Sequence, residues 1–542
     1  MKALSAARPV RSLALLLLFA SPVLAGTPRP AEDIYRQGIL PSGVPLVAER
    51  GGGVRLAGAA AACANCHRRS GLGMQEGRQS IPPIAGIYLF HPRAGATDNL
   101  DLPFVAGMRA DRDSYSDMTL ARAIRDGIGA DGKPLSYLMP RYRLNDGEMS
   151  QLIDYLKQLS PGAVPGVTDS VLHFATIVTP DADPLRRKGV LEVITKFFED
   201  KNHYVRAEAP RLQSSRRMMF KAFRHWELHV WELTGAPETW EAQLDAKLAA
   251  EPVFAVISGV GGATWAPVHR FCEEQALPCL FPNVDLPVVA EDDFDNLYLS
   301  KGVLLESELI ARALMAPPGG PETHRVVQVY RESDVGGQAA AALAKALPAG
   351  NHALVNFRIP AGAGARKLAA SVREARPGDI LVLWLRPNDI AALGPVPAGV
   401  TRAFISGRMG GLEQSPVPAD WRKIARMAYP VDLPERRVVR LDYPLGWFRI
   451  RQIELVAQEA QADTYLACGL VSDALNHMAD TFVRDYLVER IEEMLEHRVI
   501  TGYYPRLALA PGQRFASKGG YIVHFESPTG TRVIADGDWT VP

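Results

Sequence analysis

Residues 63–67 read CANCH, and this stretch decides what kind of domain the first part of the chain can form. In the pattern C-x-x-C-H, two thiols add to the vinyl groups of a haem and the adjacent histidine ligates its iron. A thioredoxin-like redox pair would lack the histidine and follow a βαβ pattern, and a zinc half-site would need a second cysteine pair nearby. The motif predicts one covalently attached haem c, held by Cys63 and Cys66, with His67 as the proximal ligand.

A second stretch bears on the other axial position of the iron, which takes Met, His or no protein ligand. Residues 136–159 read SYLMPRYRLNDGEMSQLIDYLKQL. Asn145 and Glu148 have the spacing of a helix capping box, and apolar residues then recur at helical spacing. This pattern predicts a helix that begins near Asn145, with Met139 in the loop before it.

Residues from about 33 to 160 resemble a class I c-type cytochrome, an all-α domain. The matching segments are DIYRQGI (33–39), CANCH, PPIAG (82–86) and LMPRY followed by the helix. The resemblance implies that Met139 is the distal ligand, with Met108, Met118 and His91 as rivals. It also implies that a carbonyl near Pro82 binds the proximal histidine, and that the haem transfers electrons with both axial positions closed.

The N-terminus has the order of a secretory signal. Three basic residues precede the apolar run SLALLLLFASPVLA, which ends in small residues at Ala25 and Gly26. We expect cleavage of residues 1–25, export to the periplasm and no membrane span in the mature chain; a retained anchor is the alternative. Basic and acidic residues number 60 each, so the mature chain is close to neutral, which does not favour nucleic acid as a partner.

Beyond the cytochrome-like domain, assigned to residues 26–160, a Pro/Gly linker is expected at 161–170 and a second domain at 171–542. Apolar, β-branched runs alternate there with stretches of helical length, as in LHFATIV (172–178), RVVQVYR (325–331) and DILVLWLR (379–386). Strands that alternate with helices predict an α/β domain with parallel sheets.

The order of these runs resembles a type I periplasmic solute-binding protein of the branched-chain amino-acid kind, which has two lobes around a cleft. Residues 253–283, VFAVISGVGGATWAPVHRFCEEQALPCLFPN, match the family's strand, turn, helix and strand. The resemblance places a ligand carboxylate against Ser258, Gly262, Ala263 and Thr264; the alternative is a plain turn. The first lobe departs from the family, because FATIVTPDADPLRRKGV (174–190) carries charge in place of a glycine-rich turn.

The remaining cysteines have structural interpretations. Cys272 and Cys279 are expected in a helix and at the start of a strand, where they either form a disulfide or stay reduced. Cys468 is expected to be buried.

The function expected from these observations is electron transfer by a periplasmic mono-haem cytochrome. Its second domain would either dock a redox partner or sense a small solute such as an amino acid or carboxylate. The redox partner would be a dehydrogenase or a terminal acceptor. The alternative is a solute-binding or sensory protein in which the haem reports redox state. An enzyme is not expected, because no catalytic constellation stands out in the sequence, although the chain could be the electron-transfer subunit of a dehydrogenase.

Overall fold

The computed structural model describes residues 30–76, 79–90, 113–159, 163–212, 224–315, 324–348, 350, 352–478 and 481–542. The predicted signal peptide and two rivals of Met139, His91 and Met108, lie outside these residues. The chain forms two compact units, Met1–Asn65 with Tyr115–Leu156, and Cys66–Ser114 with Lys157–Pro542. The predicted domain boundaries stay predictions, but the grouping associates the segment after the haem motif with the α/β part.

The first unit is mainly helical, with α1 (Pro30–Arg36), α4 (Asp117–Asp126) and α5 (Asp146–Gln158). It also contains a small antiparallel sheet, in the order β2-β1-β5, which the all-α expectation did not include. The strands are β1 (Val47–Arg50), β2 (Val54–Ala57) and β5 (Arg141–Tyr142). Gly52 and Gly53 have positive φ angles of 85° and 78°, which the tight turn of the β1–β2 hairpin requires.

The predicted helix before residue 160 is confirmed as α5. Its capping box forms as expected: the Asn145 amide donates to Glu148 Oε2 at 2.9 Å, and the Glu148 amide donates to Asn145 Oδ1 at 2.9 Å. The apolar face of α5 is buried through Met149, Leu152, Ile153 and Leu156. These contacts fix where the helix begins, four residues after strand β5, which itself follows the loop that carries Met139.

The second unit begins with the segment after the haem motif and continues into a first α/β lobe. The short elements are α2 (Ala64–His67), whose start belongs to the first unit, β3 (Met74–Glu76), β4 (Gln79–Ile81) and α3 (Gly86–Phe90). The first lobe has a parallel sheet in the order β10-β9-β8-β6-β7. Its strands are β6 (Val171–Val178), β7 (His225–Glu232), β8 (Ala255–Ile257), β9 (Cys279–Leu280) and β10 (Asn296–Leu297).

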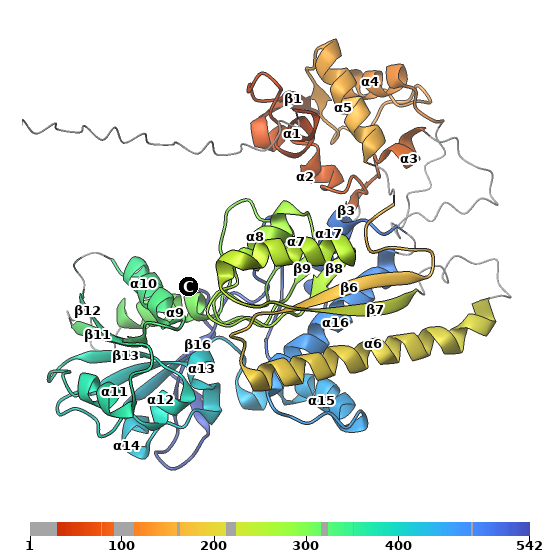
Figure 1. The fold of residues 1–542 in the computed structure, drawn as a ribbon. Coiled ribbons are helices and arrows are strands. Elements are labelled where there is room, and N and C mark those ends of the chain that lie inside the picture. The colour runs from red at the N-terminus through yellow and green to blue at the C-terminus, as the bar shows by residue number, and fades with distance from the viewer. Residues whose placement is uncertain are drawn as a thin grey trace, which may run out of the picture. The chain divides into compact units, whose positions relative to one another are not determined.

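Helices cover both faces of this sheet, as expected for a parallel sheet. Figure 1 shows α6 (Pro184–Leu212) along one face, and α7 (Trp240–Ala250) and α8 (Ala266–Glu274) over the other. On the α6 side, Phe174 packs against Phe198 and Trp226. On the α7 side, Ala175, Ile177 and Trp231 share a buried cluster with Trp240 and Leu244.

The second lobe contains a seven-stranded sheet in the order β12-β11-β13-β14-β15-β16-β17. Five strands are parallel: β11 (Arg325–Arg331), β12 (Ala353–Ile359), β13 (Ile380–Trp384), β14 (Arg402–Ser406) and β15 (Ala425–Tyr429). The closing strands β16 (Tyr521–Phe525) and β17 (Val533–Ala535) are antiparallel, so this sheet is mixed at one edge.

The helices of the second lobe are α9 (Val303–Met315), α10 (Gly336–Ala346), α11 (Ala365–Val372), α12 (Pro387–Ala391), α13 (Gly407–Gly410) and α14 (Ala419–Arg422). Three helices follow: α15 (Pro434–Ile450), α16 (Gln458–Met478) and α17 (Arg484–Leu495). Helix α16 returns to the first lobe and packs on α6, where Tyr465 meets Phe197 edge to face. The chain thus crosses between the lobes more than once.

Candidate haem site and interlobe cleft

His67 ends the short helix α2 and is held in the form that can bind iron. The residue is 6% exposed, and its Nδ1 lies 2.9 Å from the carbonyl oxygen of Pro82. A carbonyl only accepts hydrogen bonds, so Nδ1 carries the proton and Nε2 keeps its lone pair for a metal. Burial lowers the pKa of His67, although the hydrogen bond to Pro82 acts in the opposite direction, and this favours the neutral imidazole. The predicted carbonyl contact is confirmed.

The chain near His67 is bent by glycine so that Pro82 can reach it. The Gly73 amide donates to the His67 carbonyl at 3.1 Å, and Gly73 has a φ of 74°. A Cβ at Gly73 would lie 2.1 Å from the carbonyl oxygen of Ile81, so any side chain would displace the strand that leads to Pro82. Glycine at this position therefore helps to orient His67.

Cys63 and Cys66 flank the same turn and suit the covalent attachment of haem. Cys63 is half-buried, Cys66 is exposed, and neither forms a disulfide in the described chain. The Asn65 side chain donates to the Ala59 carbonyl at 2.7 Å and so fixes the start of α2. Two accessible thiols next to a neutral, oriented imidazole are the donor set that a c-type haem requires.

Met139 lies in a loop of the first unit, outside regular structure, as predicted. It is partly buried; its amide donates to the Ser136 carbonyl at 3.0 Å, and its own carbonyl accepts from Arg141 Nη1 at 2.9 Å. These bonds hold the backbone of the loop and leave the thioether unused. The rival Met118 is 80% exposed on α4. Ligation of iron by Met139 stays a prediction.

The segment after the haem motif is bound to α17. The Ser70 amide and hydroxyl donate to the two carboxylate oxygens of Glu489, at 2.9 and 2.6 Å. Arg68 pairs with Glu492, which Arg514 also contacts at 2.5 Å. Burial raises the pKa of Glu489 to about 7, against the lowering effect of Arg68 and Ser70. The segment that carries the proximal ligand is thus tied to the α/β part by buried polar contacts.

Apolar contacts strengthen the same attachment. Leu72 and Ala85, each 1% exposed, belong to the large core cluster of the α/β part. The Arg69 guanidinium lies 4.2 Å from the centre of the Phe294 ring and 3.3 Å from the Asp485 carboxylate. This attachment could not be predicted from the sequence, because Arg68 and Ser70 lie more than 400 residues from Glu492 and Glu489.

The backbone donors predicted for a solute carboxylate are occupied by the chain itself. The Ala263 amide donates to Asp181 Oδ2 at 2.7 Å, and the Gly262 amide donates to Thr179 Oγ1 at 3.1 Å. Thr179 Oγ1 in turn donates to Asp181 Oδ1 at 2.6 Å. A Cβ at Gly262 would lie 2.3 Å from the Asp181 carboxyl carbon. An internal carboxylate therefore fills the place where the resemblance put a ligand carboxylate.

The two hydroxyls of the predicted solute site are also used within the chain. Ser258 is buried; its Oγ lies 2.7 Å from Thr464 Oγ1 and accepts from Asn283 Nδ2 at 2.9 Å. Thr264 Oγ1 accepts from the Ala266 amide in the first turn of α8, at 3.3 Å. The structure thus brings the four predicted residues to one edge of the first sheet, with the Gly262 and Ala263 amides and the Ser258 hydroxyl already hydrogen-bonded within the chain.

An ion cluster joins the two lobes. Asp285, which follows β9 and is 3% exposed, accepts from Arg186 at 2.8 Å and from Arg386 at 2.6 Å, with Arg408 at 3.9 Å. Arg386 also binds both oxygens of Asp334, at 2.7 and 2.8 Å. The three guanidinium groups hold the pKa of Asp285 well below its usual value, although burial alone would raise it.

This ion cluster was not predicted from the sequence, although part of its signal is visible there. Arg386 and Arg408 each follow a buried strand, β13 and β14, within two residues of its end. The carboxyl ends of parallel strands meet at one edge of a sheet, where ligands usually bind in open α/β folds. Two arginines in equivalent positions would have indicated a charged cleft.

Two buried acids lie next to the ion cluster. Burial raises the pKa of Glu306 to about 8; its oxygens accept from the Ser406 hydroxyl and, at 2.8 Å, from the Arg408 amide. Burial likewise raises the pKa of Asp463 to about 8, and Asp463 Oδ2 accepts from Tyr504 at 3.0 Å. Within the described residues, Asp463 Oδ1 and Arg408 Nε have no hydrogen-bond partner.

The other cysteines are buried. Cys272 and Cys279 are free thiols in this structure, close enough to interact, and burial together with the neighbouring Cys279 raises the pKa of Cys272 well above its usual value. Their disulfide stays a prediction. Cys468 is buried in α16, as expected, and burial raises its pKa.

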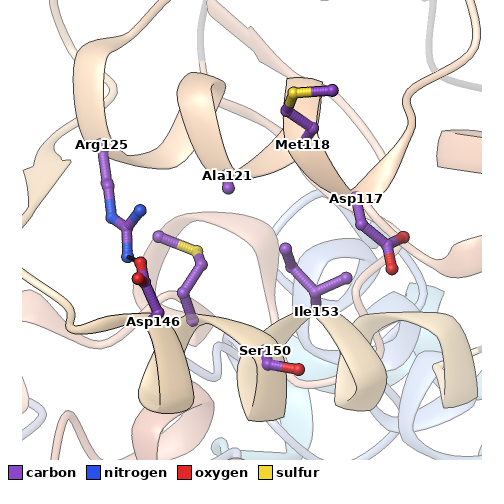
Figure 2. A pocket seen from close by; sticks show the side chains of 8 residues that line it. Asp117, Met118, Ala121, Arg125, Asp146, Ser150 and Ile153 are labelled. Atoms are coloured by element: carbon purple, nitrogen blue, oxygen red, sulfur yellow. Dashed lines mark hydrogen bonds and ion pairs between the residues drawn. The ribbon is translucent and has the colours of Figure 1, made fainter.

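A shallow hollow lies between α4 and α5 of the first unit. Figure 2 shows Met118 and Asp117 on one side, Ser150 and Ile153 on the other, and the Arg125–Asp146 ion pair, 2.7 Å long, at one end. Its volume is about 180 Å³. None of its lining residues belongs to the predicted haem set.

Comparison with known proteins agrees with the class that the first part of the chain defines. The cytochrome c family model matches residues 53–160, a region that contains CANCH and Met139. A search of curated proteins found no match to this chain. Within the described residues, no helix is long and apolar enough to cross a membrane.

Solved structures similar to this chain are periplasmic-type binding proteins. A fatty acid ABC transporter substrate-binding protein from Thermomonospora curvata is 15% identical, covering 70% of this chain and 95% of its own, with a TM-score of 0.47. The branched-chain amino acid transporter substrate binding protein LivJ from Streptococcus pneumoniae, in complex with isoleucine, is 11% identical (69% and 100% covered, TM-score 0.48). The leucine binding protein LivK from Thermotoga maritima is 14% identical (68% and 98% covered, TM-score 0.48).

Proposed function

We propose that this chain is an exported mono-haem electron-transfer protein, and that its α/β part docks a redox partner, either a dehydrogenase or a terminal acceptor. The observation that carries the proposal is the CANCH motif with His67 already oriented by Pro82. The family model supports the class of the haem-bearing part.

In this function, the chain's own residues bind and orient the cofactor. Cys63 and Cys66 would hold the haem through two thioether links, His67 Nε2 would bind its iron, and Met139 would offer its thioether as a further ligand. A c-type haem bound by these residues would supply one-electron transfer. The Pro82 carbonyl keeps His67 in one tautomer and one ring orientation, so that little rearrangement accompanies a change of charge.

The state of the cleft supports docking over sensing. The Asp181 side chain accepts a hydrogen bond from the amide of Ala263, and the Thr179 side chain accepts one from the amide of Gly262. Asp285 pairs with both Arg186 of the first lobe and Arg386 of the second. An anionic solute would have to displace the Asp181 carboxylate, which is exposed but hydrogen-bonded, and the buried Asp285 carboxylate, which is already paired with arginines. The α/β part then contributes its surface and its attachment to the haem segment rather than an open binding pocket.

The test uses the full, haem-loaded chain. Pyridine haemochrome analysis of denatured protein should give one covalently bound haem per chain, and the Cys63→Ala/Cys66→Ala variant should give none. A thermal-shift screen against amino acids and small carboxylates should then show no stabilisation. A solute present at 100 times its Kd would add about 2.7 kcal/mol of stability, which such a screen detects. A reproducible rise in melting temperature with one of these solutes would favour sensing over docking. The absence of covalent haem would refute the electron-transfer role.

A second candidate function is the binding of a small zwitterionic solute. Buried Asp463 Oδ1 and Arg408 Nε, which have no hydrogen-bond partners in the described residues, are groups that an amino acid's ammonium and carboxylate would satisfy. The ammonium would displace the proton that Asp463 otherwise holds at neutral pH. In this case, Asp463→Asn should abolish any rise in melting temperature that a solute causes in the screen. A rise that persists in Asp463→Asn would exclude this site.

A further inference from the structure

Two histidines and a glutamate meet on one face of the first sheet, away from the haem motif and from the interlobe ion cluster. His173 is the third residue of β6, and Glu227 and His229 are the third and fifth residues of the edge strand β7. The parallel register pairs His173 with Glu227 and Ala175 with His229, so the three side chains share one face. This is the α7 side of the sheet, which Figure 1 shows above β6 and β7.

The donor atoms of these three residues have the spacing of a metal-ligand set. His173 Nδ1 lies 3.1 Å from His229 Nε2 and 3.7 Å from Glu227 Oε2, and His229 Nε2 lies 4.0 Å from Glu227 Oε1. All the donor atoms of the set lie within 4.8 Å of one another. Two nitrogens bound to one tetrahedral zinc, at about 2.0 Å each, are about 3.3 Å apart. A single ion can therefore contact all three side chains after small movements.

A carboxylate behind His229 prepares that ring for a metal. Glu251, just after α7, has its Oε2 3.2 Å from His229 Nδ1, and the same oxygen accepts from Trp231 Nε1 at 3.1 Å. A negatively charged carboxylate this close to Nδ1 favours the tautomer with the ring proton on Nδ1, which leaves the lone pair on Nε2, the nitrogen that lies near His173. Metal-binding histidines usually have such a carboxylate partner on the other ring nitrogen.

The site is also accessible and not otherwise neutralised. The side chains of His229, His173 and Glu227 are 13%, 24% and 50% exposed, so an ion can enter from solvent. Within the described chain, the ion-pair partners of Glu227 are these two histidines. Without a metal, the cluster offers only one hydrogen bond, between His173 Nδ1 and His229 Nε2.

A second cluster, His269 with Glu273 and Asp293, has a similar composition but a structural use. The Glu273 carboxylate already accepts from the amides of Phe294, Asp295 and Asn296, at 2.9 to 3.0 Å. These bonds hold the chain that leads into β10, so Glu273 is not available to an ion.

We propose that His173 Nδ1, His229 Nε2 and the Glu227 carboxylate bind one first-row divalent metal ion, with Glu251 as a positioning residue. Imidazole and carboxylate donors in this number suit zinc, and the remaining coordination position is open to water or to an outside ligand. The site is independent of the haem and of the docking role.

The test is isothermal titration of the full, haem-loaded chain with Zn²⁺ after treatment with a chelator. We expect one strong site that is weakened at least 100-fold in His229→Gln and 10- to 100-fold in Glu251→Gln, as for other carboxylates behind metal-binding histidines. The matched control is Glu232→Gln on the same strand, whose carboxylate pairs with Arg187 and should leave the affinity unchanged.

X-ray absorption at the zinc edge supplies an independent readout, and should show two imidazole ligands in the parent chain. Metal-free His229→Gln should keep the circular dichroism and melting temperature of the parent, which separates lost binding from lost fold. Absence of a strong zinc site in the parent chain, or equal affinity in parent and His229→Gln, would overturn the proposal. The haem content is unaffected in either case, so this result does not bear on electron transfer.

Discussion

Substitution of Asp285 by asparagine should destabilise the α/β part by removing the charge on which three arginines converge. Asp285 is 3% exposed and contacts Arg186 at 2.8 Å and Arg386 at 2.6 Å. Removal of one partner of a buried ion pair costs about 3 to 5 kcal/mol. The lower figure applies here, because Arg386 keeps Asp334 and Arg408 keeps Glu459.

The expected change in melting temperature follows from the size of the unit. With about 2.1 cal/mol/K of unfolding entropy per residue and about 435 residues in the second unit, a loss of about 3 kcal/mol lowers the melting temperature by about 3 °C. The assay is differential scanning calorimetry of the full haem-loaded chain at pH 7. Asp420→Asn is the control, because Asp420 pairs with Lys423 on the surface and should leave the melting temperature unchanged.

The pH dependence gives the same prediction a second readout. The pKa of Asp285 is lowered in the folded state, so its contribution is complete above the unfolded value of about 3.9 and is lost as the pH falls below it. The difference in melting temperature between the parent and Asp285→Asn should therefore shrink as the pH falls below 4. If the melting temperatures of the parent and Asp285→Asn differ by less than 1 °C at pH 7, the conclusion that this ion cluster joins the lobes is wrong.

Three further predictions concern single residues. Met139→Ala should remove the weak long-wavelength absorption band of a thioether bound to ferric haem, and an unchanged spectrum would exclude Met139 as a ligand. Cys66→Ala should leave one thioether link, which moves the α band of the pyridine haemochrome to longer wavelength; an unmoved band would contradict attachment at this thiol. The pKa of Glu306 is about 8 in the folded chain, above its value in the unfolded chain, so the parent should lose stability as the pH rises from 5 to 8. Glu306→Gln lacks this ionisation, and its melting temperature should therefore rise relative to that of the parent over the same range. A melting-temperature difference independent of pH would mean that Glu306 is ionised throughout.

The parts of this structure that could be predicted from the sequence depend on local chemistry. CANCH predicts haem attachment because its three donors are adjacent in the sequence, and the capping box at Asn145 correctly predicted the start of α5. The buried runs 172–178, 325–331 and 379–386 became β6, β11 and β13, because apolar β-branched stretches of that length have few other stable environments. The antiparallel pairing of β16 with β15, about 90 residues earlier in the chain, depends on the path of the whole chain.

The contacts that could not be predicted join residues far apart in the chain. Asp181 reaches the amide of Ala263 across 82 residues, and Arg386 reaches Asp285 across 101. The charged stretch 174–190 indicated a departure from a solute-binding lobe, but not that Asp181 would occupy the predicted carboxylate position. Pairing of this kind depends on which strand ends meet, and the sequence specifies that only through the complete topology.

The attachment of the haem segment to α17 has a consequence for biogenesis. Ser70 binds Glu489, which lies 419 residues later in the chain, and Arg68 binds Glu492, which lies 424 residues later. The segment can therefore dock only after nearly the whole polypeptide has been synthesised, and until then the thiols of CANCH remain on an unanchored chain. The last helices thus set the moment at which this segment becomes anchored, while Cys66 stays exposed after they have folded.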